Sequence, residues 1–103
     1  MSWTLYKNLI TLAGRRVNTT RVITTYDILL TDHTIFCDTD SDTYIVTLPV
    51  GINGQEFKII NCGSNVLTIA PTGAELLRGA NSSDTLIAGG VALFTYETTE
   101  GWW

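Results

Sequence analysis

Three aspartates at alternate positions, Asp38, Asp40 and Asp42, are the first residues whose spacing suggests chemistry. A D-x-D-x-D pattern begins the EF-hand type of calcium loop, because Ca²⁺ takes oxygen ligands such as carboxylates. That loop also needs glycine at its sixth position and glutamate at its twelfth, and here those positions are Thr43 and Pro49. Aspartate and serine equally favour turns, since their side chains hydrogen-bond to nearby backbone. We expect a hairpin turn, with a weak calcium site completed by a neighbouring subunit as the second interpretation.

Catalytic groups are sparse in this sequence. His33 is the single histidine, so every Ser-His-Asp, Cys-His or histidine-metal scheme depends on it, and no G-x-S-x-G motif accompanies it. Glu97 and Glu100 are the candidates for a pair of carboxylates acting on a glycoside, but nothing marks them as a pair. We therefore predict a protein with no catalytic residues and no cofactor.

Large aromatic side chains gather at the end of the chain, in YETTEGWW. Tyr96, Trp102 and Trp103 can contact another subunit, stack on a glycan or pack in the core, because aromatic rings give large flat contact areas. Cys37 and Cys62 each follow an apolar run and have no metal-type spacing. No signal-peptide pattern is found, and we expect two buried thiols rather than a disulfide.

Charge divides the chain into two parts. The first 22 residues hold Lys7, Arg15, Arg16 and Arg21 and no acid, whereas all ten carboxylates follow Val22. The functional interpretation is a basic arm, residues 1–21, that docks on an acidic partner; the alternative is an arm folded over its own acidic body. The acidic remainder would repel phosphate, so nucleic acid is not an expected partner, and neither is a membrane.

The elements that must position these residues are short strands. From Val22 onward, runs rich in Val, Ile, Thr, Tyr and Phe alternate with Gly, Asn, Asp and Pro, as is typical of β structure. We predict seven or eight strands and a second domain covering residues 22–103. The expected strand ranges are 22–30, 34–37, 43–48, 56–61, 66–70, 75–78, 84–87 and 91–97.

Alternation along these runs predicts which side chains point inward. Tyr44, Val46 and Leu48 share one face of their strand, and Phe57 with Ile59 and Leu67 with Ile69 follow the same rule. Several strands also carry apolar residues on the other face. We therefore predict an all-β fold, an antiparallel sandwich or jelly roll, whose outer face meets other subunits. The short connections cannot hold crossover helices.

From Gly14 onward the sequence resembles a β domain that recurs in bacteriophage virion proteins. The likeness rests on GRRVNTTRV, YDILLTDHTIFCDTD, VTLPVGINGQEFKIINCGSNVLTIAPTG, ELLRG and YETTEGWW, taken in order. It is similar to segments of tail fibres and tail spikes and to small capsid decoration or head-fibre proteins. The resemblance implies a non-enzymatic virion protein, made in the host cytoplasm, that is often a homotrimer with buried outer faces. It also implies that Asp38 to Thr43 form a turn, although a metal on the trimer axis stays open.

The fibre proteins attach such a domain to long shafts, whereas here only about 20 residues precede it. The arm then becomes the expected anchor on a major capsid protein or tail component. Its apolar contacts would be Trp3, Leu5, Tyr6, Leu9, Ile10 and Leu12, and its charged contacts Arg15, Arg16 and Arg21. The alternative is a tail-fibre or spike tip that adsorbs to the host by binding surface glycan through Tyr96, Trp102 or Trp103.

Overall fold

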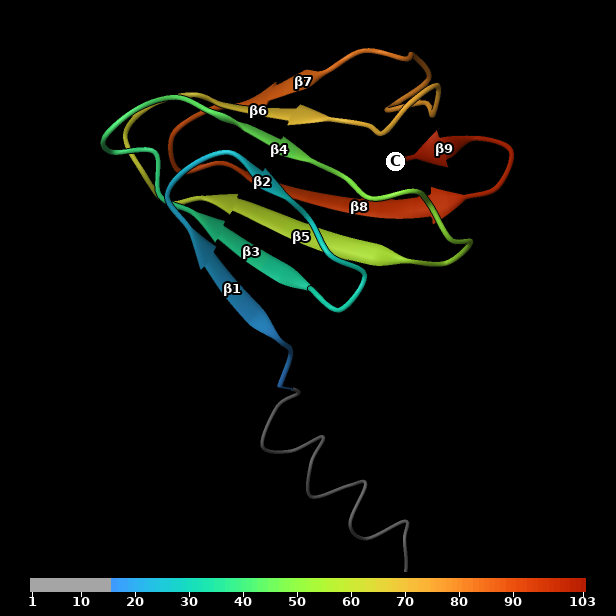
Figure 1. The fold of residues 1–103 in the computed structure, drawn as a ribbon, viewed down its shortest axis with the longest axis horizontal. Coiled ribbons are helices and arrows are strands. Elements are labelled where there is room, and N and C mark those ends of the chain that lie inside the picture. The colour runs from blue at the N-terminus through green and yellow to red at the C-terminus, as the bar shows by residue number, and fades with distance from the viewer. Residues whose placement is uncertain (1–15) are drawn as a thin grey trace, which may run out of the picture.

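The computed structural model describes residues 16–103, and these residues form two facing β-sheets (Figure 1). The strands are β1 (Thr19–Val22), β2 (Tyr26–Asp27), β3 (Thr34–Cys37), β4 (Ile45–Thr47), β5 (Glu56–Asn61), β6 (Leu67–Ala70), β7 (Asp84–Leu86), β8 (Val91–Glu97) and β9 (Gly101–Trp102). The five-stranded sheet has the order β1-β3-β5-β8-β9, and the four-stranded sheet has the order β2-β4-β6-β7. The all-β prediction is confirmed for this part of the chain. It holds no helix long and apolar enough to cross a membrane.

The chain changes sheet after almost every strand. β1, β3 and β5 are parallel neighbours in one sheet, and β2, β4 and β6 are parallel neighbours in the other. Antiparallel pairing begins only with β7, β8 and β9. The predicted antiparallel sandwich or jelly roll is therefore wrong in its strand pairing for the first six strands. A crossover helix is not needed, because the strand that lies in the opposite sheet itself forms the crossover between parallel neighbours.

Strand positions were predicted better than strand partners. The ranges of β3, β5 and β8 agree with the sequence-based ranges. The expected strand 22–30 is instead the end of β1 and all of β2, separated by a crossing at residues 23–25. The expected strand 75–78 contains only bridges from Leu77, because Arg78 and Gly79 have positive φ angles of 51° and 89° and turn the chain. β9 was not predicted. β1 also takes in Thr19 to Arg21, from the segment expected to be an arm.

The core lies between the sheets and confirms the predicted alternation. Tyr44, Val46 and Leu48 are buried, whereas Ile45 between them is 46% exposed. The buried apolar side chains come from both sheets and include Ile35, Cys37, Phe57, Ile59, Leu67, Ile69, Ala92, Phe94 and Trp102. Trp102 packs against Phe57 with ring centroids 5.6 Å apart.

A buried polar cluster joins the turns at one end of the sandwich, on the left in Figure 1. The Asn61 side-chain amide donates to the carbonyl oxygens of Asn65 (2.8 Å) and Leu86 (2.9 Å), and its oxygen accepts from the Thr39 hydroxyl (2.8 Å). Thr39 and Asn61 are completely buried. The cluster therefore fixes the β3–β4, β5–β6 and β7–β8 connections to one another. A Cβ added to Gly63 would lie 2.1 Å from the Thr39 backbone nitrogen, so the turns approach closely here.

A buried carboxylate holds the first two strands in place. Asp32 accepts hydrogen bonds from the Thr20 hydroxyl (2.7 Å), the Tyr26 hydroxyl (2.6 Å) and the Leu29 backbone N–H (2.9 Å). Burial alone would raise the pKa of Asp32, but the three hydrogen bonds together outweigh it and lower the pKa. Burial and the contact with Asp32 raise the pKa of Tyr26 to about 12, so its hydroxyl keeps its proton.

Candidate functional site

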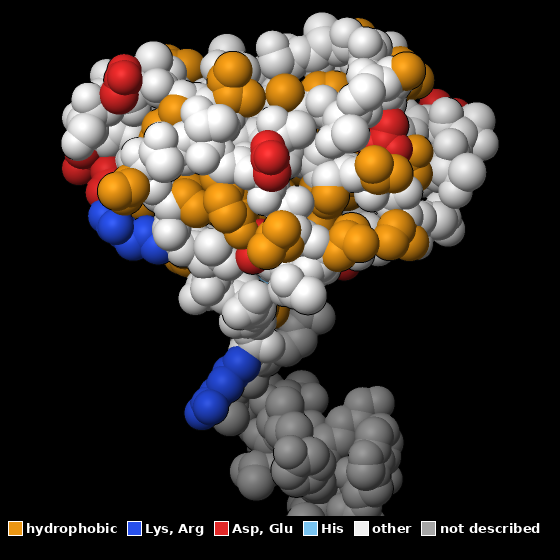
Figure 2. Space-filling model, viewed as in Figure 1, with side chains coloured by type: hydrophobic (Ala, Val, Ile, Leu, Met, Phe, Trp, Pro, Cys, Tyr) orange, Lys and Arg blue, Asp and Glu red, His pale blue; other side chains and the backbone are white. Residues whose placement is uncertain are grey.

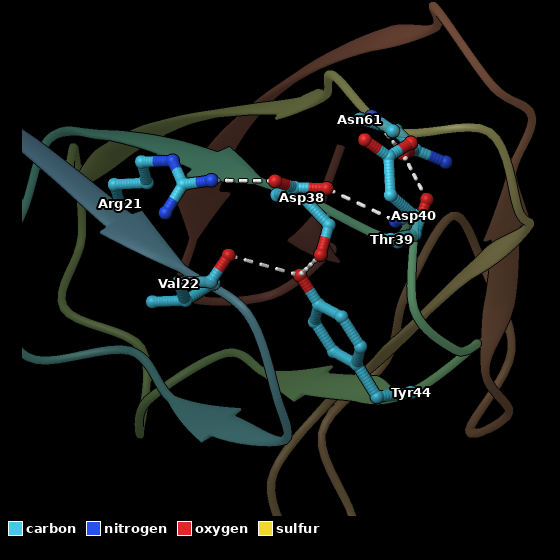
Figure 3. Close-up of polar contacts among 8 residues, drawn as sticks. Arg21, Val22, Asp38, Thr39, Asp40, Tyr44 and Asn61 are labelled. Atoms are coloured by element: carbon cyan, nitrogen blue, oxygen red, sulfur yellow. Dashed lines mark hydrogen bonds and ion pairs between the residues drawn. The ribbon is translucent and has the colours of Figure 1, made fainter.

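The aspartate turn, residues 38–43, connects β3 in one sheet to β4 in the other (Figure 3). It is therefore a turn, as expected, but it is not a hairpin. The Asp38 carboxylate binds the Arg21 guanidinium at 2.5 Å and accepts the Asp40 backbone N–H at 3.0 Å. The Asp42 carboxylate accepts the backbone N–H of Thr43 at 2.8 Å.

The Asp38 and Asp42 carboxylates thus accept backbone N–H groups of the turn itself. Across residues 16–103 the structure brings together no group of three His, Cys, Asp or Glu side chains suited to a metal. The Tyr44 hydroxyl lies 3.0 Å from the Asp38 carbonyl oxygen and 3.2 Å from that of Val22, so the turn is fastened to the core below it. Burial raises the pKa of Tyr44, which keeps this donor protonated. Asp38, Asp40 and Asp42 thus form a structural turn within one copy of the chain.

His33 lies just before β3, at the opposite end of the sandwich. Its Nδ1 is 2.9 Å from the Thr34 hydroxyl. With Arg16, Asn18, Gln55 and Glu56 it lines an open groove of about 530 Å³, where β1, β3 and β5 begin. Thr34 itself is buried, with 5% exposure.

The two cysteines are free thiols in different surroundings. Cys37 is buried in the core, as predicted, and burial raises its pKa to about 12. Cys62 is exposed, so the expectation that both thiols are buried is wrong for this one. Asn61, the residue before it, takes the inward position in the strand.

The terminal aromatic residues have separate environments. Trp102 is completely buried, and its Nε1 has no partner among the described residues. It therefore cannot contact another subunit or a glycan. Tyr96 is half-buried and lies edge-on to Trp102 with ring centroids 5.0 Å apart. A Cβ on Gly51 would lie 2.1 Å from the Tyr96 ring, so the backbone covers this ring as well. Only Trp103, at 54% exposure, presents a large aromatic surface.

Glu75 is the residue of this region that sequence reasoning missed. Its carboxylate oxygens accept the Gly51 backbone N–H at 3.0 and 3.1 Å. Burial and this carboxylate raise the pKa of Tyr96. Together with Thr98 and Thr99 they line an open groove of about 350 Å³. No local pattern marks Glu75, because its partners are distant in sequence.

Glu97 and Glu100 do not act as a facing pair. Glu97 accepts the backbone N–H groups of Thr99 and Glu100, both at 2.9 Å, and so closes the turn between β8 and β9. The Glu100 carbonyl oxygen accepts the Trp103 indole N–H at 3.1 Å. The Glu97 carboxylate therefore has a structural role in this turn, whereas the cited bonds of Glu100 use its backbone.

The expected anchor residues Trp3, Leu5, Tyr6, Leu9, Ile10, Leu12 and Arg15 lie outside the described residues. Arg16 is exposed beside the groove that contains His33. Arg21 belongs to β1 and is paired with Asp38, so it is part of the folded body.

Large apolar side chains are exposed on the surface of the body. Figure 2 shows hydrophobic side chains spread over one face among uncharged polar ones, with few charges between them. Those exposed in the described residues are Val17, Ile23, Leu29, Leu30, Ile45, Val50, Ile52, Val66, Ile87, Val91, Leu93 and Trp103. The strands do carry apolar residues on both faces, as the alternation predicted.

No family model matches this chain, and no curated protein matches it.

Proposed function

We propose that this chain is a non-enzymatic structural accessory protein of a bacteriophage virion. In this proposal it is a trimeric β domain anchored on the capsid, as a decoration or head-fibre protein, through its N-terminal arm. The resemblance that begins at Gly14 motivates the proposal. The observation that supports it best is a complete core combined with outward-facing apolar side chains such as Val91 and Leu93, which are 56% and 57% exposed. Contiguous apolar surface of this kind is typical of faces that meet other subunits.

The arm supplies the second part of the proposal. It is basic, whereas the rest of the chain is acidic, so it suits an acidic partner surface better than the body does. At about 25 cal/mol per Å² of apolar area, an arm that buries a few hundred Å² contributes several kcal/mol before ordering costs. Three arms on one trimer would multiply the attachment through avidity.

Removing residues 1–15 tests the anchor and leaves β1 in place. It also keeps the hydrogen bond that the Thr34 backbone N–H donates to the carbonyl oxygen of Asn18, just before β1. We expect the shortened chain to keep its oligomeric mass but to lose co-sedimentation with virus particles that lack the protein. A full-length variant with Arg15→Glu and Arg16→Glu keeps the apolar residues of the arm and reverses two of its charges, so it tests the charged part of the arm separately. Unchanged particle binding by the shortened chain would refute the anchor, and failure of the full-length chain to bind particles would refute the virion role.

Receptor binding at a fibre or spike tip is the second candidate function. It is favoured by the exposed ring of Trp103, and the groove beside Glu75 and Tyr96 offers polar groups for a sugar. Trp103→Ala should then abolish adsorption of the protein to host cells without unfolding it. Ile87→Ala, at a side chain that is 70% exposed, is the control. Equal adsorption of both variants and the original chain would reject this function.

A further inference from the structure

The outer face of the five-stranded sheet carries an ordered apolar surface. Strand register places Phe36, Ile60 and Val91 side by side on β3, β5 and β8, and Leu93 lies two residues further along β8. Val91 and Leu93 are more than half exposed, while Phe36 and Ile60 are half-buried. Trp103 joins the same face, because it pairs with the outward-facing residue Thr95 through two backbone hydrogen bonds. These five apolar residues are here called the apolar row.

The outer face of the four-stranded sheet is different in character. Its register rows contain a single large apolar residue, Ile45, together with one carboxylate, Asp27. The other outward positions are Thr47, Thr68, Ala70 and Thr85. Val66 and Ile87, which are 45% and 70% exposed, continue the outward alternation beyond these rows. Within the rows this face is rich in hydroxyl groups that water solvates well, so the five-stranded sheet has the more continuous apolar outer surface.

Charged residues lie beside the apolar row: Arg21 aligns with Phe36 and is already paired with Asp38, and Glu56 and Lys58 lie on β5. Glu56 and Lys58 are two residues apart on β5 and therefore point to the same outer face. Lys58 aligns with Leu93, and Glu56 aligns with Thr95. Neither makes an ion pair with another described residue, whereas Arg21 and Arg78 each do. A partner that covered the apolar row would remove water from Lys58, which costs free energy unless an opposite charge arrives with it.

Further copies of the chain supply the opposite charges for both Lys58 and Glu56. In a closed trimer each copy has two neighbours: one brings an apolar row and a Glu56 to meet Lys58, and the other brings a Lys58 to meet Glu56. We propose that the outer face of the five-stranded sheet is the surface through which copies of this chain associate, which rests on the proposed trimer and names its contact face. The hydroxyl-rich face of the four-stranded sheet then stays in water.

Sedimentation velocity on the full chain, over a range of protein concentrations, tests the face. Leu93→Asp places a carboxylate within the apolar row and should raise the dissociation constant about 100-fold. Ile45→Asp makes the same change on the other outer face and should alter that constant less than about 3-fold. Thermal unfolding followed by circular dichroism verifies that both variants are folded.

A charge exchange tests the pairing without changing apolar area. Glu56→Lys and Lys58→Glu should each weaken association about 10-fold, because each leaves like charges facing one another. The double variant restores opposite charges across the contact and should return to within about 3-fold of the original chain. Restoration is a result that a merely structural role of either residue would not produce.

The outcomes separate this inference from the proposed function. An oligomer that persists in Leu93→Asp, or a double variant weaker than both single variants, overturns the contact face and leaves the trimer and the virion role standing. If Ile45→Asp dissociates the oligomer instead, the four-stranded sheet is the contact face and the inference is wrong. A monomer at all concentrations refutes both the face and the trimer, while particle binding by the arm still decides the virion role.

Discussion

Replacing Asn61 by alanine tests whether the buried polar cluster holds the connecting turns together. The substitution removes an amide that donates to two carbonyl oxygens, those of Asn65 and Leu86, at 2.8 and 2.9 Å. It also removes the oxygen that accepts from the Thr39 hydroxyl at 2.8 Å and from the Gly63 backbone N–H at 3.2 Å. Thr39, Gly63 and Asn65 belong to connecting turns, and Leu86 is the last residue of β7.

The magnitude follows from what is left behind. The side chain of Asn61 has 0% exposure, so water does not replace it freely. A net contribution of about 1 kcal/mol for each hydrogen bond, with a further cost for buried partners left unpaired, gives a loss of about 3 to 4 kcal/mol in the free energy of unfolding. That loss is a large part of the stability of a domain of this size, which is about 5 to 15 kcal/mol in total.

Urea denaturation followed by tryptophan fluorescence gives the free energy of unfolding, because Trp102 is in the core. All variants should be compared at one protomer concentration, since association would add to apparent stability. Asn65→Ala is the matched control: its residue is exposed and its side chain donates mainly to the Thr39 carbonyl oxygen at 2.6 Å, so we expect a loss of about 1 kcal/mol.

A double-mutant cycle with Thr39→Val tests whether the cluster acts as a unit. Thr39 and Asn61 share a direct hydrogen bond, so their individual losses should not add and the coupling should exceed about 0.5 kcal/mol. A loss below about 1 kcal/mol for Asn61→Ala, with an unchanged denaturant slope, would show that the turns are held by other contacts. The reasoning about unpaired buried partners would then be refuted.

Three further predictions concern other groups. The pKa of Asp32 is lowered in the fold, so the ionised side chain stabilises the fold above its ordinary pKa, and this stabilisation is lost as the pH falls through the folded-state pKa. The melting temperature of Asp32→Asn should therefore fall less steeply with acid than that of the original chain. Identical profiles of melting temperature against pH would contradict this prediction. Gly63→Ala should lower the free energy of unfolding by at least about 3 kcal/mol or prevent folding, because its Cβ would meet the backbone of the aspartate turn at 2.1 Å. Gly54→Ala is the control: its Cβ has open space, so we expect a loss of only about 1 kcal/mol for its φ of 84°. Equal melting temperatures of the two variants would exclude the close approach. The exposed Cys62 should react with a maleimide in the native protein. The buried Cys37, whose pKa is about 12, should react only after denaturation. Mass spectrometry counts the labels, and two labels on the native chain would show that the core opens readily.

Much of the local structure can be predicted from the residues alone. Alternation of Tyr44, Val46 and Leu48 against Ile45 identifies the inward face because the side-chain period of a strand is fixed at two. The same rule identifies Phe57 and Ile59.

The pairing of strands could not be predicted in this way. Residues such as Asp, Asn and Gly favour a tight change of direction, and the sequence does not distinguish a hairpin within one sheet from a crossing between two sheets. The residues 38–43 were therefore correctly predicted as a turn and wrongly as a hairpin. Neighbouring strands are parallel when each turn leads to the opposite sheet. The choice of sheet is decided by packing across the whole core, not by the turn residues.

The polar centres were missed for a related reason. The partners of Asn61 come from residues 39, 63, 65 and 86, and those of Asp32 from residues 20, 26 and 29. A buried asparagine and an exposed one look alike in sequence until the fold brings their partners together. Trp102 and Trp103 differ only by one position, yet the strand period buries one and exposes the other.

β1 also determines how mechanical load enters the molecule. Any force applied through residues 1–15 reaches the body through this edge strand, which is fastened by its backbone bonds to β3, by Thr20 on Asp32 and by Arg21 on Asp38. A force along the strand axis acts on all of these hydrogen bonds and ion pairs at once, whereas a force perpendicular to the strand breaks them one after another. If residues 1–15 are the anchor proposed above, the resistance of the attachment to force should depend on the direction of the pull and be greatest when the tension is aligned with β1.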